Sequence, residues 1–313
     1  MKLEKIIKEE YENIKQVTEN VLKVTTNAEE IIKLYARYAP QMSKYSTETM
    51  KKTFDEKITK EVKEYTSKDI TAASIYIMSS EEKSLAYELL KGIFLTELIQ
   101  LHYEKTQSQE KYILFTSDTL DNISHIGFQL NGPKIEVIGN CGNAVGCQMR
   151  NGIIDASGEF QSHTGVQMMG GTINISSDAQ SYIGHDMQGG NIFVYGSCFG
   201  NVGRKMNGGS IIISGSVYDS VGTKMTGGEI TIMQNVNSCG THLAGGRIIV
   251  NGDVTIETGT LMKEGEIIVD GSCYGRTGLF MSDGKIIVAK ICEDYNRAVG
   301  GEIYQNGKRI FPE

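Results

Sequence analysis

Few side chains in this sequence are spaced for catalysis or for metal binding. His163, His185 and His242 fall at different places in the repeating unit described below, so they do not form a column of ligands. The best pair of carboxylates, Glu136 and Asp155, lies at equivalent places in neighbouring units. Acid-base catalysis needs such carboxylates to converge with further ionisable groups. We therefore assign no catalytic, cofactor-binding or metal-binding residue and expect no cofactor.

The six cysteines include no Cys-x-x-Cys pair. Four of them occupy one place in the unit where other units have apolar residues, and a free cysteine packs there as a small hydrophobic side chain. These four are Cys141, Cys198, Cys273 and Cys292. Cys273 and Cys292 belong to neighbouring units and would lie about 5 Å apart in a stack, within reach of a disulfide. We favour core packing over a bridge because disulfides are uncommon in the cytosol.

Glycine recurs with a fixed period in the later two thirds of the chain. The first glycine of each unit follows the previous one by nineteen residues, and once by eighteen: Gly127, Gly146, Gly165, Gly184, Gly203, Gly222, Gly240, Gly259 and Gly278. Leucine or methionine stands three residues later, and a second glycine, or Pro133 in the first unit, stands six residues later. A repeated strand unit of this length indicates a solenoid. We expect the first glycines to form corners, because a corner needs positive φ or a close backbone approach.

Every unit also places an isoleucine two residues after the second glycine, and a further apolar residue two positions beyond it. The isoleucines are Ile135, Ile154, Ile173, Ile192, Ile211, Ile230, Ile248, Ile267 and Ile286. Alternation of this kind predicts a short strand with one buried face. The sequence therefore predicts a parallel β-helix of about nine 19-residue coils over residues 127–290, with the isoleucines stacked as a buried ladder.

The residue between the two inward positions of each strand must point outward. It is polar in the first units and large and apolar in most of the later ones, at Phe193, Ile212, Ile249, Ile268 and Ile287. A solvated wall would stay polar, and an exposed apolar patch of several hundred Å² usually marks an interface. These five residues predict a protein interaction face that is covered either by the N-terminal domain or by another subunit.

Residues 1–110 show helical periodicity instead and predict a compact bundle. Helices are expected over residues 3–22, from Ala28 (capped by Asn27) to just before Pro40, over Glu48 to Tyr65, near Ile70 to Ile77, and from a capping box of Ser79 and Glu82 to Leu101. Residues 111–126, with the segment KYILF, are expected to form a linker or a capping strand. Residues 291–313 are expected to cap the other end, since an open end exposes unpaired backbone groups.

Composition excludes several classes of function. The formal net charge is −7, and the glycine-rich half is the more acidic one, whereas a nucleic-acid surface needs clustered cationic residues. No apolar run approaches the roughly 20 residues that span a bilayer, and the charged N-terminus is unlike a signal peptide. We expect a cytoplasmic protein with no nucleic-acid and no membrane partner.

The units VGRKMNGGSIIISG and VGTKMTGGEITI resemble the glycine-repeat (GXGXG) domain found in the C subunit of formylmethanofuran dehydrogenase and in the C-terminal part of the glutamate synthase large subunit. The resemblance covers Gly127 to Val288 and implies a right-handed parallel β-helix that supports neighbouring catalytic domains or subunits. The catalytic parts of those complexes cannot be recognised in this sequence.

The function expected from these features is that of a non-catalytic scaffold or assembly protein. It would bind a protein partner, or a copy of itself, through the β-helix wall or the helical domain. A more specific version makes it a subunit of a complex related to one of those two. The alternative is an enzyme with an acidic groove at the junction of the helical and β-helix domains, near Glu136 and Asp155.

Overall fold

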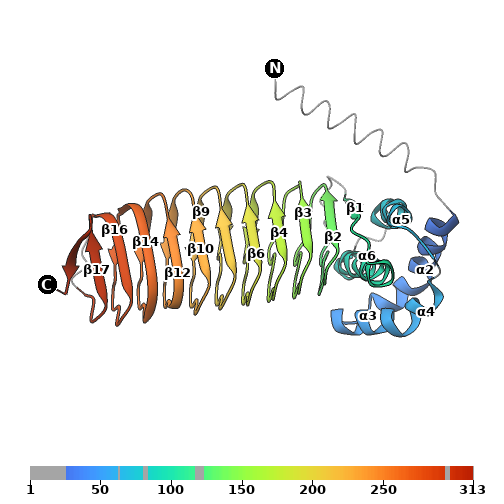
Figure 1. Ribbon diagram of the computed structural model, residues 1–313, viewed down its shortest axis with the longest axis horizontal. Helices are drawn as coiled ribbons and strands as arrows, with labels where there is room; N and C mark the ends of the chain where they lie inside the picture. Colours follow the sequence, from blue (N-terminus) through green and yellow to red (C-terminus); the bar gives the residue numbers. More distant parts are fainter. Residues whose placement is uncertain (1–25, 63, 80–83, 117–122, 293–296, 313) are drawn as a thin grey trace, which may run out of the picture.

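A computed structural model describes residues 26–62, 64–79, 84–116, 123–292 and 297–312 (Figure 1). The chain forms a helical part at one end of an elongated rod of stacked strands, and the C-terminus lies at the far end of the rod. The predicted fold class, helices followed by a parallel β-helix, is confirmed. The helix expected over residues 3–22 lies outside the described residues.

The helical part contains α2 (Thr26–Met42), α3 (Thr47–Thr53), the π-helix η1 (Phe54–Ile58), α4 (Thr59–Glu61), α5 (Ser67–Ser79) and α6 (Leu85–Thr106). These helices bury a shared core in which Phe94 of α6 is central. The rings of Tyr35 and Phe54 meet the Phe94 ring edge to face, with centroids 5.3 and 5.5 Å away.

Pro40 does not end α2, contrary to the sequence-based expectation. The helix continues to Met42, and the next backbone N–H, that of Ser43, still donates to the carbonyl of Ala39 at 2.9 Å. A proline in the last turn removes only one helical hydrogen bond. Burial of Ala39 and Met42 offsets that loss.

The helix expected over residues 48–65 ends early and is interrupted. α3 passes into the π-helix η1, and the chain leaves helical geometry at Val62, which has an extended backbone with φ −73° and ψ 115°. The wider π turn advances less per residue than an α-helix. It therefore keeps Met50, Phe54 and Ile58, all buried and spaced by four, on the same face.

The capping box stands at a different helix from the one expected. α5 runs on to Ser79, and α6 begins only at Leu85. The reciprocal bonds are found at the start of α5, where the Asp69 N–H donates to Thr66 Oγ1 at 3.3 Å and the Thr66 N–H donates to Asp69 Oδ2 at 2.8 Å. Asp69, at the third position of α5, therefore completes a capping box with Thr66. Glu82, which was expected to complete the box of the last helix, lies outside the described residues.

One strand from each unit stacks into a continuous parallel ladder, called here the first wall. Its strands, in order, are β1 (Lys111–Phe115), β2 (Lys134–Ile138), β3 (Ile153–Ala156), β4 (Thr172–Ile175), β6 (Asn191–Val194), β8 (Ser210–Ile213), β10 (Glu229–Ile232), β12 (Ala244–Val250), β14 (Glu264–Cys273), β16 (Lys285–Ile291) and β17 (Glu302–Gln305). KYILF is thus a strand that pairs with the first unit, and the ladder extends one strand past the last unit as well.

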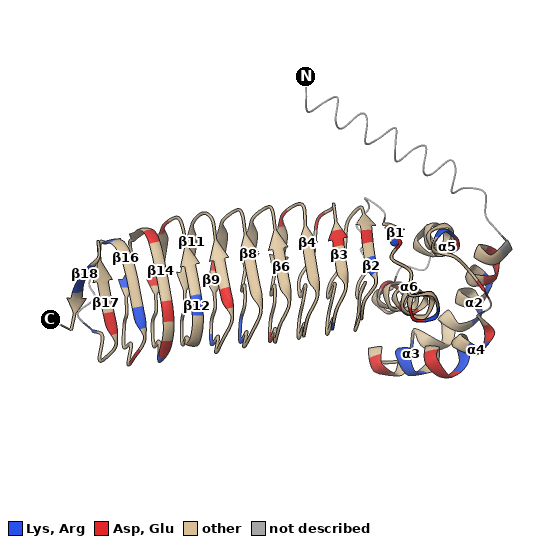
Figure 2. Ribbon diagram, in the orientation of Figure 1, with Lys and Arg blue, Asp and Glu red and all other residues tan. Residues whose placement is uncertain are grey.

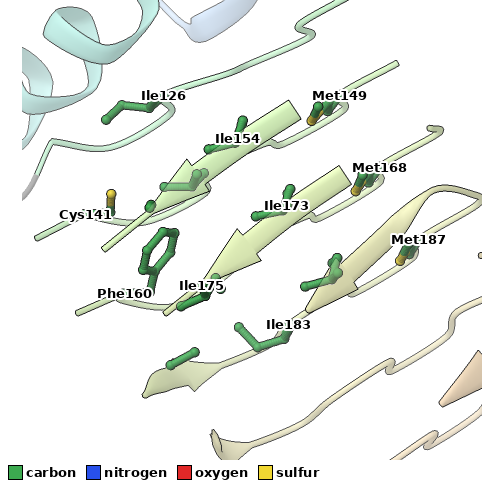
Figure 3. Packing of buried hydrophobic residues seen from close by; sticks show 14 of the residues in the cluster. Ile126, Cys141, Met149, Ile154, Phe160, Met168, Ile173, Ile175, Ile183 and Met187 are labelled. Atoms are coloured by element: carbon green, nitrogen blue, oxygen red, sulfur yellow. The ribbon is translucent and has the colours of Figure 1, made fainter. Parts of the chain in front are cut away.

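A second wall of shorter strands faces the first across the core. It contains β5 (Ala179–Ser181), β7 (Cys198–Gly200), β9 (Val217–Val221), β11 (Val236–Cys239), β13 (Val254–Thr258) and β15 (Arg276–Thr277). Ile192, Ile211 and Ile230 are vertical neighbours, and each is fully buried, as the repeat predicts. Figure 3 shows Met149 and Met168 stacked in the same way at one side of this core.

The first glycine of every unit has positive φ, between +63° and +75°, so the predicted corners are present. At Gly203, with φ +63°, an added Cβ would lie 2.2 Å from Cδ1 of Ile230. The corner therefore excludes side chains for two reasons, the backbone conformation and the isoleucine ladder beneath it.

The cysteine column is correct for three of its four predicted members. Cys141, Cys198 and Cys273 are buried, whereas Cys292 is exposed. The ladder between β14 and β16 shifts register by one residue after Val269, so that Ile291 stands opposite Cys273. Cys273 and Cys292 are both free, so there is no bridge between them, but the core packing predicted for this pair holds for Cys273 alone.

The C-terminal end of the rod is covered by the chain itself. β18 (Lys308–Phe311) turns back and pairs antiparallel with β17. This hairpin uses the outer hydrogen-bonding edge of the last parallel strand, as expected of a cap over residues 291–313.

Candidate functional site

The five residues predicted to form an interaction face lie in one vertical column of the first wall. Phe193 stands directly below Ile212, Thr231 comes next, and Ile249, Ile268 and Ile287 follow in register. All are partly buried, because each side chain is flanked by those of the coils above and below. We call this set the apolar column. Figure 1 shows helices only at the β1 end of the rod, so no described helix covers it.

The same column is polar toward the helical end. Glu136 and Asp155 stack there as expected, but each is paired with a lysine. Lys111 Nζ lies 2.5 Å from Glu136 Oε2, and Lys134 Nζ lies 3.1 Å from Asp155 Oδ2. Asn174 also donates to Asp155 at 2.6 Å. These two carboxylates are engaged in ion pairs along the wall, and neither lines the pocket described below between the helical part and the first coils.

A column of alternating charge runs beside the apolar column in the later coils. It consists of Glu229, Arg247, Glu266 and Lys285, which occupy equivalent positions on β10, β12, β14 and β16. Glu302 on β17 continues this register beyond Lys285 and pairs with Arg309 of the terminal hairpin. Arg247 lies 3.6 Å from Glu229 and 3.1 Å from Glu266, and Lys285 lies 3.6 Å from Glu266. We call the four residues from Glu229 to Lys285 the charged column. Figure 2 shows its blue and red segments on the later strands, whereas β4, β6 and β8 carry none.

The other flank of the apolar column carries further exposed apolar side chains. Tyr195 is 64% exposed and Met233 is 44% exposed. Asn251, Asp270 and Ala289 continue this flank toward the C-terminal end. The apolar column therefore has an ionic border on one side and a border of mixed apolar and polar side chains on the other.

The second wall presents a smaller aromatic feature. Phe199 and Tyr218, on β7 and β9, are about half exposed and lie with ring centroids 5.6 Å apart. Asn237 follows them in the next coil and donates to the Tyr218 carbonyl. The aromatic contact is limited to this pair, because Asn237 and then Thr255 interrupt it.

The helical part and the first coils enclose an open pocket of about 290 Å³, called here the junction pocket. Its helical side carries Lys51, Asp55, Glu97 and Glu104, and its rod side carries Gln129 and Arg150. Lys51 Nζ lies 2.5 Å from Glu97 Oε2. The side chain of Glu97 is only 4% exposed, so the deepest ionisable group of the pocket is a carboxylate.

Burial raises the pKa of Glu97 to about 7, although the Lys51 ammonium opposes the shift. Asp55 and Glu104 raise it further by repulsion. A carboxyl group with a pKa near neutrality can hold or release a proton under physiological conditions. The sequence signal for it is a single glutamate inside the apolar run of α6, which helical periodicity alone does not single out.

The histidines form no column in the repeat, as predicted, but His163 and His185 both contact the Tyr182 ring, which brings these two histidines together. His163 stacks on Tyr182 with centroids 4.9 Å apart, and His185 lies 3.2 Å from its neighbour Asp186. Within the described ranges, no group of three or more His, Cys, Asp or Glu side chains is placed to hold a metal ion. The longest described helix, α6, has charged residues inside its apolar stretch, and no described helix is suited to span a bilayer.

No family model matches this chain, and no curated protein matches it at a significant level.

Proposed function

We propose that this protein is a non-catalytic assembly protein that docks another protein on the first wall of its β-helix. The observation that carries the proposal is the apolar column, with Ile249 and Ile268 at its centre, on an outer face that no described helix covers. Burying such side chains releases about 25 cal/mol for each Å² of apolar surface.

The charges on this wall also support docking rather than catalysis. Each member of the charged column lies near an opposite charge, at distances of 3.1 to 3.6 Å. Groups that neutralise each other along a ladder are not poised to transfer protons. They can border an interface and select a partner, since ionic rims contribute mainly to specificity.

The test is the mass of the native particle that contains this chain in extracts of its own cells. Wild-type protein is expected in a particle larger than the single chain of 34.4 kDa, and Ile268→Glu is expected to release it. Ile256→Glu is the matched control, because Ile256 is a 54% exposed isoleucine on the second wall. A wild-type particle of single-chain mass would contradict the proposal.

The junction pocket favours a second candidate function, an enzyme or small-molecule receptor at the domain junction. Its observation is the buried Glu97 with Lys51 against it, and Arg150 on the facing side. In this second candidate, Glu97 is the acidic group of the groove, in place of the Glu136 and Asp155 named from the sequence. Walls of opposite charge suit a small polar molecule that carries both an amine and an acid group.

This second candidate is tested by thermal unfolding of the purified chain with small amines, carboxylates and zwitterions. A compound that raises the midpoint of the wild type and of Glu264→Gln, an exposed site on the rod, but not of Glu97→Gln, would support it. Equal shifts in all three proteins, or none, would exclude the pocket.

The proposal also includes a cytoplasmic location and a role as one component of a complex of the formylmethanofuran dehydrogenase or glutamate synthase type. Six free thiols support the location, since such thiols persist where the compartment is reducing. The parallel β-helix with its glycine corners supports the role.

A further inference from the structure

The order of charges along the charged column suggests what docks on the wall. Glu229, Arg247, Glu266 and Lys285 alternate in sign in four successive coils. Such a series is its own complement when it is reversed. We propose that the occupant of the first wall is a second copy of this chain, packed face to face with its rod antiparallel; this rests on the proposed docking function of the wall.

A two-fold axis between any two adjacent coils pairs opposite charges. We place it between the coils of Arg247 and Glu266, because this register gives all four members of the charged column a partner over six strands and leaves Glu302 opposite Ser210. If the axis passes between the coils of Arg247 and Glu266, Glu229 of each copy faces Lys285 of the other. Arg247 then faces Glu266, and every charge of the column meets an opposite one. An axis moved onto the coil of Arg247 would place Arg247 against itself and Glu229 against Glu266, which like-charge repulsion disfavours.

The same register matches the apolar column to itself. Ile249 of each copy faces Ile268 of the other at the centre, and Thr231 faces Ile287. Ile212 then faces Tyr304 of the second copy, which continues the column on β17. The exposed Met233 faces Ala289, and Asp270 faces Asn251, so no two carboxylates meet on that flank. Phe193 lies opposite β18 at the margin of the contact.

The shape of the chain also permits this arrangement. The helical part stands at the β1 end of the rod, and the contact lies on the later coils (Figure 1). In an antiparallel pair centred between β12 and β14, the helical part of each copy projects beyond the C-terminal end of the other. The two helical parts therefore stay far apart and leave both junction pockets open.

The contact area is small, and small interfaces are typical of weak association. The contact includes six stacked strands of the first wall, from β8 to β17, which together span about 29 Å along the rod. Along each strand it extends over five consecutive residues, from the charged column to the far flank, which span about 16 Å. Each copy thus contributes about 500 Å², or about 1,000 Å² in total, which is the lower bound for a specific interface. We expect a dimer whose dissociation constant is in the micromolar range.

Alternation of charge also lowers repulsion within each chain, so the experiment has to separate contacts within a chain from contacts between chains. Mixing two variants does this. Glu229→Lys places two lysines opposite each other in each half of a dimer, and Lys285→Glu places two glutamates there. In a mixed dimer the two substituted positions face each other with opposite charges, and so do the unchanged Lys285 of one chain and Glu229 of the other. Each chain still keeps its own unfavourable neighbours.

The measurement is sedimentation velocity from about 1 to 100 µM, the range around the expected dissociation constant. We expect a dimer for the wild type, at least about tenfold weaker association for each variant alone, and recovery in the equimolar mixture. Glu257→Lys, which alters the Arg276 pair on the second wall, is the matched control and should leave association unchanged. Arg247→Glu mixed with Glu266→Arg serves if either first variant fails to fold.

A wild-type chain that stays monomeric over this range, or variants that fail to recover association on mixing, would overturn the antiparallel dimer. These results leave the docking function standing if the native particle is still large and still depends on Ile268. A native particle of single-chain mass would contradict the docking function and this inference together.

Discussion

The Thr96 hydroxyl oxygen, on α6, accepts a hydrogen bond of 2.8 Å from the backbone N–H of Gly127, the first glycine of the first unit. In the next unit the equivalent N–H, that of Gly146, donates at the same distance to the carbonyl of Ile126 in the coil before it. Thr96 therefore supplies the acceptor that a preceding coil would otherwise provide.

Gln100, one turn further along α6, also supplies an acceptor in place of a preceding coil. Its Oε1 accepts from the Asn131 N–H at 3.0 Å, where the next unit has Arg150 N–H donating to the Leu130 carbonyl. Close approach of the helix depends on Gly92, where an added Cβ would lie 1.9 Å from the Ser124 carbonyl oxygen. α6 and β1 together thus cap the open end of the β-helix.

Thr96→Val should destabilise the chain by about 1 to 3 kcal/mol, because it keeps the shape of the side chain but leaves the buried Gly127 N–H without an acceptor. Thr106→Val is the matched control on the same helix, since Thr106 is exposed and water can replace its bonds. Urea unfolding of both variants checks this. Equal losses would show that α6 is not the cap described above.

Gly203→Val should destabilise the rod by a few kcal/mol, because a β-branched residue tolerates positive φ poorly and its Cβ would overlap Ile230. Ser210→Ala, on β8, should change stability by less than about 0.5 kcal/mol. Thermal melting of the two variants compares them, and equal effects would mean that the corner assignment is wrong.

Ile211 and Ile212 are adjacent isoleucines on β8 with opposite orientations. Ile211 is fully buried, whereas Ile212 points outward and is partly exposed. Ile211→Ala should cost about 2 to 5 kcal/mol of unfolding free energy, because it leaves a cavity in the ladder. Ile212→Ala should cost less than half as much when both are measured at concentrations too low for association. A larger loss at Ile212 would contradict the alternation.

The raised pKa of Glu97 predicts a pH dependence of stability with a definite sign. The carboxyl releases its proton near pH 4.5 in the unfolded chain and near pH 7 in the folded one. Between these values the unfolded chain binds fewer protons, so the free energy of unfolding falls as the pH rises, by a few kcal/mol at most. Below and above this window Glu97 contributes no slope.

The measurement is the difference in unfolding free energy between Glu97→Gln and the wild type from pH 4 to 8, in steps that cover the window. The variant lacks the titrating group, so it should become progressively more stable relative to the wild type up to about pH 7. The variant also loses the ion pair with Lys51, which changes its unfolding free energy independently of the Glu97 titration. The criterion is therefore how the difference in unfolding free energy changes with pH, and not its absolute size. A difference that does not change with pH would contradict the assignment.

The repeat could be predicted from the sequence because every coil has the same steric requirements, a corner with positive φ and an apolar side chain on the buried face. Gly203 and its equivalents recur at corners, and Ile211 and its equivalents recur on the buried face, so a fixed period specifies the ladder register without any contact being known. The position of the apolar column followed from that register alone, since successive side chains of a strand point to opposite faces.

Other features depended on partners that a local pattern does not contain. Leu261 and Phe280 adopt positive φ of +57° and +54°, which their residue types would not predict, because the stacked corners impose the conformation on every coil. Cys292 lies outside the core because the spacing between β14 and β16 is one residue shorter after Val269. Loss of a single residue reverses which face each following side chain occupies.

The sequence by itself therefore determined the rod, its inward ladders and the column of outward apolar residues, since all three follow from periodic backbone geometry. Only the tertiary structure decided that Thr96 and Gln100 would stand in for a missing coil and that Lys51 would meet a buried Glu97. These contacts join segments far apart in the chain, and no spacing along one of them specifies its distance from the other.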